Sequence, residues 1–244
     1  MSVGLMVPEW PAPAAVRAAC TLRTGGVSAA PFESLNLGKN VGDEPAAVAE
    51  NRRRVAAALS LPSEPVWLSQ VHGTRVAEVD SESEPAAADA AVSRQRGRVL
   101  AIQVADCMPV LFASIDGAVV AAAHAGWRGL SAGVLEAAVA AMQVEPRRIL
   151  AWLGPAIGAE HFEVGEEVRS AFVAHDPHSA DALVGNARGR WQCDLLQLAR
   201  RRLAQLGVGH VSAANLCTYA ASDRCFSYRR DGRTGRMSAL IWRP

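Results

Sequence analysis

Short and almost continuously apolar runs occur near the middle of the chain, at residues 99–105, 110–115 and 118–123. Runs of this length and composition are typical of strands that are buried on both faces. Asp116 and Gly117 separate the last two runs, and this dipeptide favours a tight hairpin turn. Two further apolar runs are predicted as strands, at residues 149–153 and 237–242.

Apolar residues recur at helical spacing in four other segments. The clearest is residues 43–61, in which Asp43 can cap the helix and Pro45 suits its first turn. Three more helices are predicted at residues 131–142, 165–174 and 194–206. Ser131 and Asp194 are the expected N-caps of the first and the last of these three helices.

Predicted strands and helices alternate along the chain, with no linker and no internal repeat between them. This arrangement predicts a single α/β domain over residues 1–244, in which a mixed sheet is flanked by helices. The small, polar and acidic stretch at residues 80–91 is interpreted as a surface loop. The order of the strands in the sheet does not follow from the pattern alone.

Charge and composition exclude several classes of protein. The 244 residues include 25 basic and 24 acidic side chains, which leave a formal net charge of +1. Such a balance gives no global field to attract a polyanion, which argues against a nucleic-acid or anionic-membrane partner. No apolar run approaches the ~18 residues of a membrane span, and no basic stretch precedes an apolar core at the start. We therefore expect a cytoplasmic protein whose five scattered cysteines are free thiols or ligands.

Reactive side chains follow several of the predicted strands and lie beside glycines. Cys107 ends one strand, His124 ends another, and His72 ends an earlier extended run. Two imidazoles and one thiolate form a known catalytic zinc set that leaves the fourth position for water. Two alternatives stay open: a buried thiol with backbone-bonded histidines, or a nucleophilic pair of Cys107 and His124. Such a pair needs a third group to orient the imidazole, and Asp106 is too close to Cys107 in sequence to be an obvious one.

Three arginines lie beside glycine turns and are candidates for binding an anion. Arg23 precedes a Gly-Gly turn, Arg128 lies within the motif HAGWRG, and Arg229 precedes an Asp-Gly turn. A guanidinium beside free backbone N–H groups suits bidentate binding of phosphate or carboxylate. The alternative for each is a surface arginine that pairs with a neighbouring acid.

Six motifs together resemble one known family. SQVHG, ADCMPVL, HAGWRGL, LGPAIG with FEVGEEV, and FSYRRDGRTGR follow the N-terminal segments TLRTGGVS and SLNLGKNVGDEPAAVAENRRRV. Their sequence and order resemble the multicopper polyphenol oxidase (laccase-domain) family, over residues 19–242. The resemblance implies a layered α/β fold similar to cysteine-hydrolase-like folds. It also implies zinc, or copper in some descriptions, held by His72, Cys107 and His124.

The resemblance implies an activity as well. Bacterial members of the family are described as purine nucleoside phosphorylases, which convert adenosine, inosine and methylthioadenosine to the free base and a sugar 1-phosphate. Deamination of adenosine is implied alongside, so the expected partners are small-molecule nucleosides and phosphate. The residues assigned to catalysis are Cys107, His124 and Asp106, and those assigned to substrate binding are Arg23, Arg128, Arg229 and Gln70.

Some points stay open at this stage. Asp106, Glu163 and Glu166 are alternative candidates for the group that moves protons during deamination. Cys225 stands where the family usually has an aromatic residue before FSYRR, which can reshape a pocket wall. The six histidines include no His-x-His pair, so phenol oxidation would be at most a side reaction of copper in a single site. Two other functions remain: a hydrolase that acts on amide bonds of peptidoglycan precursors through Cys107 and His124, and a metal-binding protein without turnover.

Overall fold

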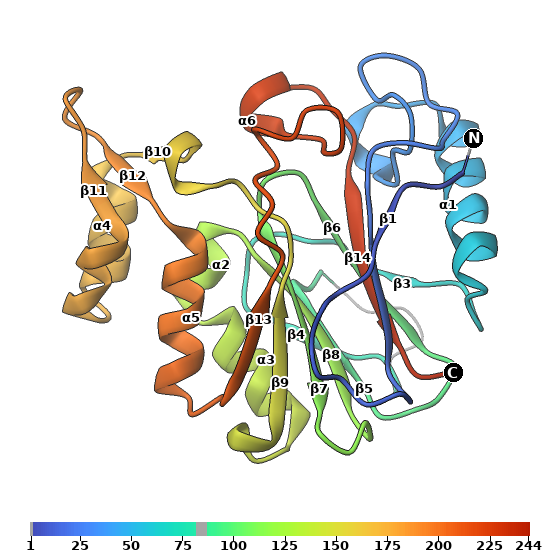
Figure 1. Ribbon diagram of the computed structural model, residues 1–244, viewed down its shortest axis with the longest axis horizontal. Coiled ribbons are helices and arrows are strands. Elements are labelled where there is room, and N and C mark those ends of the chain that lie inside the picture. The colour runs from blue at the N-terminus through green and yellow to red at the C-terminus, as the bar shows by residue number, and fades with distance from the viewer. Residues whose placement is uncertain (1, 82–86) are drawn as a thin grey trace.

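The computed structural model describes residues 2–81 and 87–244 and consists of two packed sheets with helices on both outer sides (Figure 1). The first sheet has the order β1 (Leu5–Met6), β2 (Arg17–Thr21), β14 (Met237–Trp242), β6 (Val99–Val104) and β3 (Val66–Trp67). The second has the order β13 (His210–Ala213), β9 (Ile149–Leu153), β7 (Met108–Ser114), β8 (Val120–Ala125), β5 (Ala90–Ser93) and β4 (Val76–Glu78). Both sheets mix parallel and antiparallel pairs, which confirms the predicted α/β class.

Helices cover the sheets and a small third sheet extends from them. The helices are α1 (Pro45–Leu59), α2 (Trp127–Ala132), α3 (Val134–Met142), α4 (Glu166–Val173), α5 (Leu195–Gln205) and α6 (Tyr228–Asp231). The third sheet has the order β10 (Glu163–Val164), β12 (Trp191–Cys193) and β11 (Leu183–Gly185). In Figure 1, α3 and α5 lie on the outer face of the second sheet, and α1 lies beyond the first.

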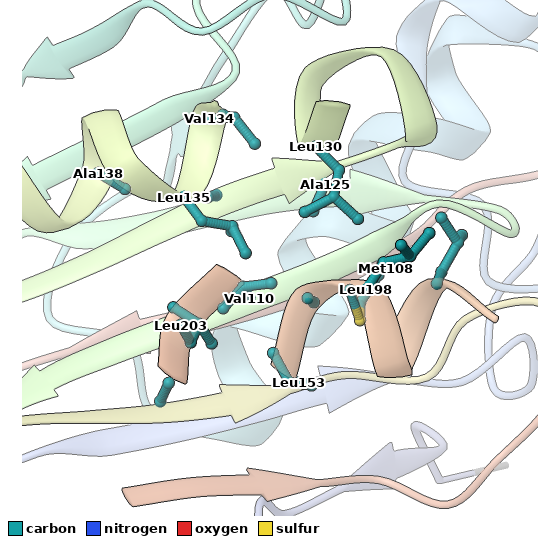
Figure 2. Close-up of a cluster of buried hydrophobic side chains, with 14 of the residues drawn as sticks. Met108, Val110, Ala125, Leu130, Val134, Leu135, Ala138, Leu153, Leu198 and Leu203 are labelled. Carbon is teal, nitrogen blue, oxygen red and sulfur yellow. The ribbon is translucent and has the colours of Figure 1, made fainter. Parts of the chain in front are cut away.

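Alternation along the strands divides the core into layers. On β7, Val110 packs in the cluster shared with α3 and α5 (Figure 2). Phe112 belongs to the same cluster, while Leu111 packs between the two sheets. On β14, Ile241 packs between the sheets and Leu240 packs toward α1. Because side chains alternate between the faces of a strand, a strand covered on both sides is apolar at every position. This explains the continuous apolar runs in the sequence.

Local signals predicted the strands β6, β7, β8, β9 and β14 and the helices α1, α4 and α5 to within a few residues, whereas one predicted helix differs. Asp194 caps α5 by accepting a hydrogen bond from the Gln197 N–H, at 2.9 Å, as expected. The helix predicted at 131–142 is instead split into α2 and α3 at Gly133, which has a φ of 102°. Ser131 therefore lies inside α2 and is not an N-cap. Asp43 does not cap α1 either, because its carboxylate binds Ser28 and Asn36.

The predicted surface loop at residues 80–91 is the main error in the fold. Residues 82–86 of this stretch lie outside the described part of the chain. Asp89 is fully buried, and Ala90 and Ala91 begin the buried strand β5. No described helix is long and apolar enough to cross a membrane.

Candidate metal centre and pocket

Three side chains from distant parts of the sequence meet at one end of the two sheets. The ligand atoms of His72, Cys107 and His124 all lie within 4.8 Å of one another. The Cys107 Sγ lies 3.8 Å from His72 Nε2, and the two imidazole rings have centroids 4.8 Å apart. His124 is buried and His72 is exposed, so the cluster opens to solvent on one side. Among the described residues, this is the group able to hold a metal ion.

Two of these residues lie on connections between the sheets. The segment after β3 carries His72 and leads from the first sheet to β4 of the second. The connection from β6 to β7 makes the same crossing and carries Cys107. His124 lies on β8 of the second sheet. The cluster therefore exists only when both sheets are packed together.

One buried carboxylate fixes both histidines. Asp89 Oδ1 lies 2.8 Å from Nδ1 of His124 and accepts the backbone N–H of His72 at 2.9 Å. Its Oδ2 accepts the backbone N–H groups of Val71 and Gly73, at 3.0 and 2.7 Å. With Nδ1 bound to a carboxylate, the Nε2 of His124 is the ring nitrogen left for a ligand, an arrangement common around metal-binding histidines. Sequence reasoning missed Asp89, whose one signal was a carboxylate directly before an apolar strand.

The backbone beside the ligands is held in an unusual conformation. His72 has a φ of 63° and Asp106 a φ of 95°, a region that residues other than glycine adopt rarely. Strained residues of this kind persist only where their surroundings hold them, and they cluster at functional sites. For Asp106 the surroundings are Thr218 Oγ1 and the Arg229 N–H, each donating to its carboxylate at 2.7 Å. Asp106 thus fixes the segment that carries Cys107 and is not itself part of the ligand cluster.

Electrostatics in the cluster favour a thiolate. Burial by itself would raise the pKa of Cys107, but the charge of His124 and hydrogen bonds from both imidazoles lower it to about 6. Burial likewise opposes a charge on His124, but the thiolate and the Asp89 hydrogen bond outweigh it and raise its pKa. The thiolate is the form of cysteine that binds metals and attacks carbonyl groups.

A pocket of about 710 Å³ opens beside the cluster and is lined in part by all three ligand residues. Its volume falls in the range of small-molecule sites. Trp67 and Tyr228 supply aromatic surface, and Lys39, Arg52 and Arg236 supply positive charge. None of these five was a candidate from sequence, and only the fold brings their segments together.

Comparison with known proteins assigns the chain to a family whose match covers most of the chain. Residues 17–244 match the family described as multi-copper polyphenol oxidoreductase laccase. The chain belongs to this family. It is 51% identical over 239 residues to the purine nucleoside phosphorylase YfiH of Escherichia coli, with 98% of each chain covered. It is 52% identical over 238 residues to a purine nucleoside phosphorylase of Pseudomonas aeruginosa, with 97% of each covered. A Neisseria meningitidis protein of known crystal structure has a TM-score of 0.95 and 46% identity, with 98% of this chain and 99% of that chain covered.

In this laccase-family member, the arginines predicted to bind an anion make other contacts. Arg23 donates from its guanidinium to the backbone carbonyls of Glu33 and Ser222. Arg128 is exposed and lies over the ring of Trp127, 4.4 Å from its centroid. Neither of these two arginines lines the pocket.

The third predicted arginine and the predicted proton carriers lie toward the small sheet. Arg229 donates from its guanidinium to the carbonyl of Glu163, and it does not line the pocket either. The Glu163 carboxylate binds Asn186, and Glu166 accepts from the indole N–H of Trp191. Neither glutamate lines the pocket.

Gln70 does line the pocket, and both ends of its amide are engaged. Its Nε2 donates to the Gln103 carbonyl at 2.9 Å, and its Oε1 accepts the Gln103 N–H at 2.8 Å. This pairing ties the segment that carries His72 to β6 in the first sheet. The contact fixes the part of the pocket wall that Gln70 and Gln103 form.

Proposed function

We propose that this protein is a purine nucleoside phosphorylase that uses the pocket beside His72, Cys107 and His124. The observation that carries the proposal is the joint presence of a ligand cluster and a cation-lined pocket of about 710 Å³. It is supported by relatives about half identical over nearly the whole chain, which bear that name. Adenosine, inosine and methylthioadenosine are the proposed substrates.

The proposed reaction sets requirements that the pocket can meet. An oxygen of phosphate forms a bond to C1′ of the ribose while the bond from C1′ to the purine N9 breaks. The electron pair leaves with the purine, which takes up a proton to give the free base. Positive charge develops on the ribose, so phosphate must be held in place against it. Cationic side chains suit the phosphate, and the aromatic faces of Trp67 and Tyr228 suit the base.

Zinc is the metal we propose for the cluster. The donor set fits this ion, because two imidazoles and one cysteine occur in catalytic zinc sites and Asp89 already orients His124. A zinc ion held by these three residues would supply a Lewis acid with an open position for water or substrate. Copper is the alternative ion for the same ligands, and elemental analysis separates the two.

Adenosine deaminase activity is proposed at the same site. In this reaction the oxygen of water forms a bond to C6 of the purine, and the C6–N bond breaks to release ammonia. The exposed His72 leaves one side of the cluster open to solvent, and the purine ring would bind on that side. Release of ammonia from adenosine in phosphate-free buffer tests this activity separately from phosphorolysis.

A thiol hydrolase is the second candidate, and one observation favours it. The buried Asp89 orients His124, and His124 favours the thiolate of Cys107. Cys107, His124 and Asp89 thus form a chain of thiol, imidazole and carboxylate groups, the arrangement found in cysteine hydrolases. Peptidoglycan precursors with amide bonds are the proposed substrates. A thiol mechanism predicts cleavage of muropeptides that survives metal chelation.

The decisive experiment measures phosphate-dependent base release from the three nucleosides, together with the metal content of the purified protein. Cys107→Ala is expected to lose both base release and tightly bound zinc. Cys193→Ala is the matched control, because Cys193 is buried in the core beside α5 and lies outside the cluster. Full zinc content and full activity in Cys107→Ala would refute the proposal. Muropeptide cleavage without any base release would favour the hydrolase.

A further inference from the structure

The permanent charges that line the pocket are all positive. Its described lining contains three permanent cations, Lys39, Arg52 and Arg236, and no carboxylate. The chain as a whole balances 25 basic against 24 acidic residues, so this excess is local. Cations gathered in a concave site raise the local concentration of anions. The pocket is therefore suited to an anionic ligand.

Arg236 has an incomplete set of partners. Its NH1 donates to the carbonyls of Thr234 and Gly235, at 2.9 and 3.0 Å. Within the described chain, its Nε and NH2 have no hydrogen-bond acceptor, and no carboxylate forms an ion pair with it. Arg236 is half-buried, and this burial lowers its pKa, while the charges of Cys107 and Asp106 oppose the effect. A partly buried cation that forms no ion pair with a carboxylate is costly, and an anion in the pocket would relieve that cost.

The position of Arg236 is fixed. A Cβ atom on Gly38 would lie 2.8 Å from the Cγ of Arg236, so the side chain passes directly over this glycine. The backbone N–H of Arg236 donates to the side chain of Asn36 at 2.8 Å. The free N–H groups are therefore held in place before a ligand arrives, which is the condition for tight anion binding.

Lys39 is the second free cation, and it is the only lysine among the 25 basic residues. It begins the 3-10 turn Lys39–Val41, is exposed, and makes no hydrogen bond or ion pair with the described residues. The guanidinium of Arg52, in contrast, already has partners within the protein. Its Nε and NH2 donate to the Leu37 carbonyl, and its guanidinium lies 3.7 Å from the centroid of the Trp67 ring. Arg52 thus stabilises the pocket wall through Leu37 and Trp67. Lys39 and Arg236 keep N–H groups that can bind a ligand.

We propose that Lys39 and Arg236 form the subsite that binds the phosphate co-substrate, beside the His72–Cys107–His124 cluster. This inference rests on the proposed phosphorylase function for its choice of ligand. Arg236 would bind two phosphate oxygens through its planar fork, and Lys39 would add a mobile charge from the exposed side. Inorganic phosphate, a sugar 1-phosphate and a nucleotide 5′-phosphate share this chemistry, and we assign the subsite to inorganic phosphate.

Steady-state kinetics test the assignment with Arg236→Met and Lys39→Met. Loss of a charge-assisted hydrogen bond should raise the KM for phosphate about 10- to 150-fold in Arg236→Met. Lys39 is exposed and contributes less, so Lys39→Met should raise this KM only about 1.4- to 5-fold. The KM for the nucleoside and the zinc content should stay close to wild type in both variants. Arg236→Lys, which keeps the charge without the fork, should recover part of the affinity.

The matched control is Arg17→Met. Arg17 is exposed and pairs with Trp242 on β14, while Met237 at the other end of β14 pairs with Val104 near the pocket. The five residue steps from Met237 to Trp242 span about 17 Å at the rise of a strand. Arg17→Met removes one positive charge at this distance and should leave the KM for phosphate unchanged. An equal rise in this variant would assign the effect to net charge and overturn the proposal.

A binding measurement separates failure of the subsite from failure of the phosphorylase function. Because Lys39 is the only lysine, it is the one side chain that an amine reagent labels besides the terminal amine, and mass spectrometry of the Lys39 peptide gives its rate of labelling. Inorganic phosphate should slow labelling of wild type and have no such effect in Arg236→Met. Protection without any base release would leave the subsite standing and refute the phosphorylase function.

Three other results would overturn the subsite. The first is active enzyme whose KM for phosphate changes less than about threefold in both variants, a change that corresponds to less than a single hydrogen bond. The second is labelling of Lys39 that phosphate does not slow. The third is stronger protection by adenosine 5′-monophosphate than by inorganic phosphate, which would assign the pocket to a nucleotide. Equal or weaker protection by ribose 1-phosphate agrees with a site shared by co-substrate and product.

Discussion

Replacing Asp89 with asparagine changes one oxygen to an NH2 group at the point where both histidine segments are held. In wild type, Oδ1 contacts His124 Nδ1 and the N–H of His72, and Oδ2 accepts the N–H groups of Val71 and Gly73. An amide has one oxygen that accepts and one nitrogen that donates. With the NH2 group facing Val71 and Gly73, two contacts place a donor against a donor. With the NH2 group facing His124, the N–H of His72 meets a donor, and Nδ1 of His124 can accept only if the ring proton moves to Nε2, the nitrogen left for a metal.

The cost follows from these contacts. A buried donor left without an acceptor costs about 1–3 kcal/mol. The backbone groups of this segment are only partly buried, since the side chains of Val71 and His72 are exposed, so the lower part of the range applies. We expect Asp89→Asn to lose about 2–3 kcal/mol of unfolding free energy. Zinc affinity should fall about 10- to 100-fold, as for other groups that orient metal ligands.

Two assays give the two quantities. Urea denaturation of the metal-free proteins gives the change in unfolding free energy without a contribution from the ion. Titration with zinc against a competing chelator gives the change in affinity. Asp223→Asn is the control, because Asp223 is exposed and makes no side-chain hydrogen bond or ion pair with the described residues. If Asp89→Asn binds zinc as tightly as wild type, the carboxylate does not orient His124 in the way described.

Two further predictions concern other positions. A Cβ on Gly126 would lie 2.9 Å from Cys107 Sγ and 3.0 Å from His72 Cδ2, so Gly126→Ala should displace the ligands and weaken zinc binding, measured by competition titration. Asp176 has a pKa lowered to about 2, chiefly by the hydrogen bond from Arg201. Because the folded pKa is below the ordinary 3.8, its contribution to stability is complete above about pH 4 and disappears as the pH falls toward 2. Asp176→Asn should therefore flatten the decline of unfolding free energy in that interval, measured by urea denaturation at each pH.

Both predictions have controls in the same chain. A Cβ on Gly209 would meet no atom nearer than 4.0 Å, so Gly209→Ala should leave zinc affinity unchanged. Equal zinc affinity in Gly126→Ala and wild type would show that the ligands tolerate the methyl group. An unaltered slope between pH 4 and 2 in Asp176→Asn would contradict the assigned role of the ion pair with Arg201.

Five of the longer strands and the helices α1, α4 and α5 could be predicted because their signals are local. Continuous apolar runs marked β6, β7 and β8, and Asp194 marked the start of α5. Gly133 was harder, because a glycine inside an apolar helical stripe can stay helical, and here its φ of 102° ends one helix and starts the next. The division of the strands into two packed sheets depends on long-range pairing and had no local signal.

The site was predicted in part, for a similar reason. The ends of predicted strands and the family motifs both pointed to His72, Cys107 and His124, which the fold brings together. The sequence did not identify the cations that line the pocket, Lys39, Arg52 and Arg236. The criterion for an anion site was an arginine beside a glycine turn, and it selected Arg23, Arg128 and Arg229. Arg236 follows a glycine as well, but its role as a candidate anion-binding residue can be inferred only from the structure, which shows both its unpaired N–H groups and the pocket that it lines.

Two connecting segments cross from one sheet to the other, and each delivers a ligand to the cluster. An ion bound there acts as a cross-link between the sheets, and any sliding of one sheet over the other would pull its ligands apart. Loading the ion and docking the sheets are thus thermodynamically linked, with about 2.7 kcal/mol gained when free metal reaches a hundred times its Kd. Backbone amides at the sheet-to-sheet interface should accordingly exchange with solvent more slowly once the ion is bound.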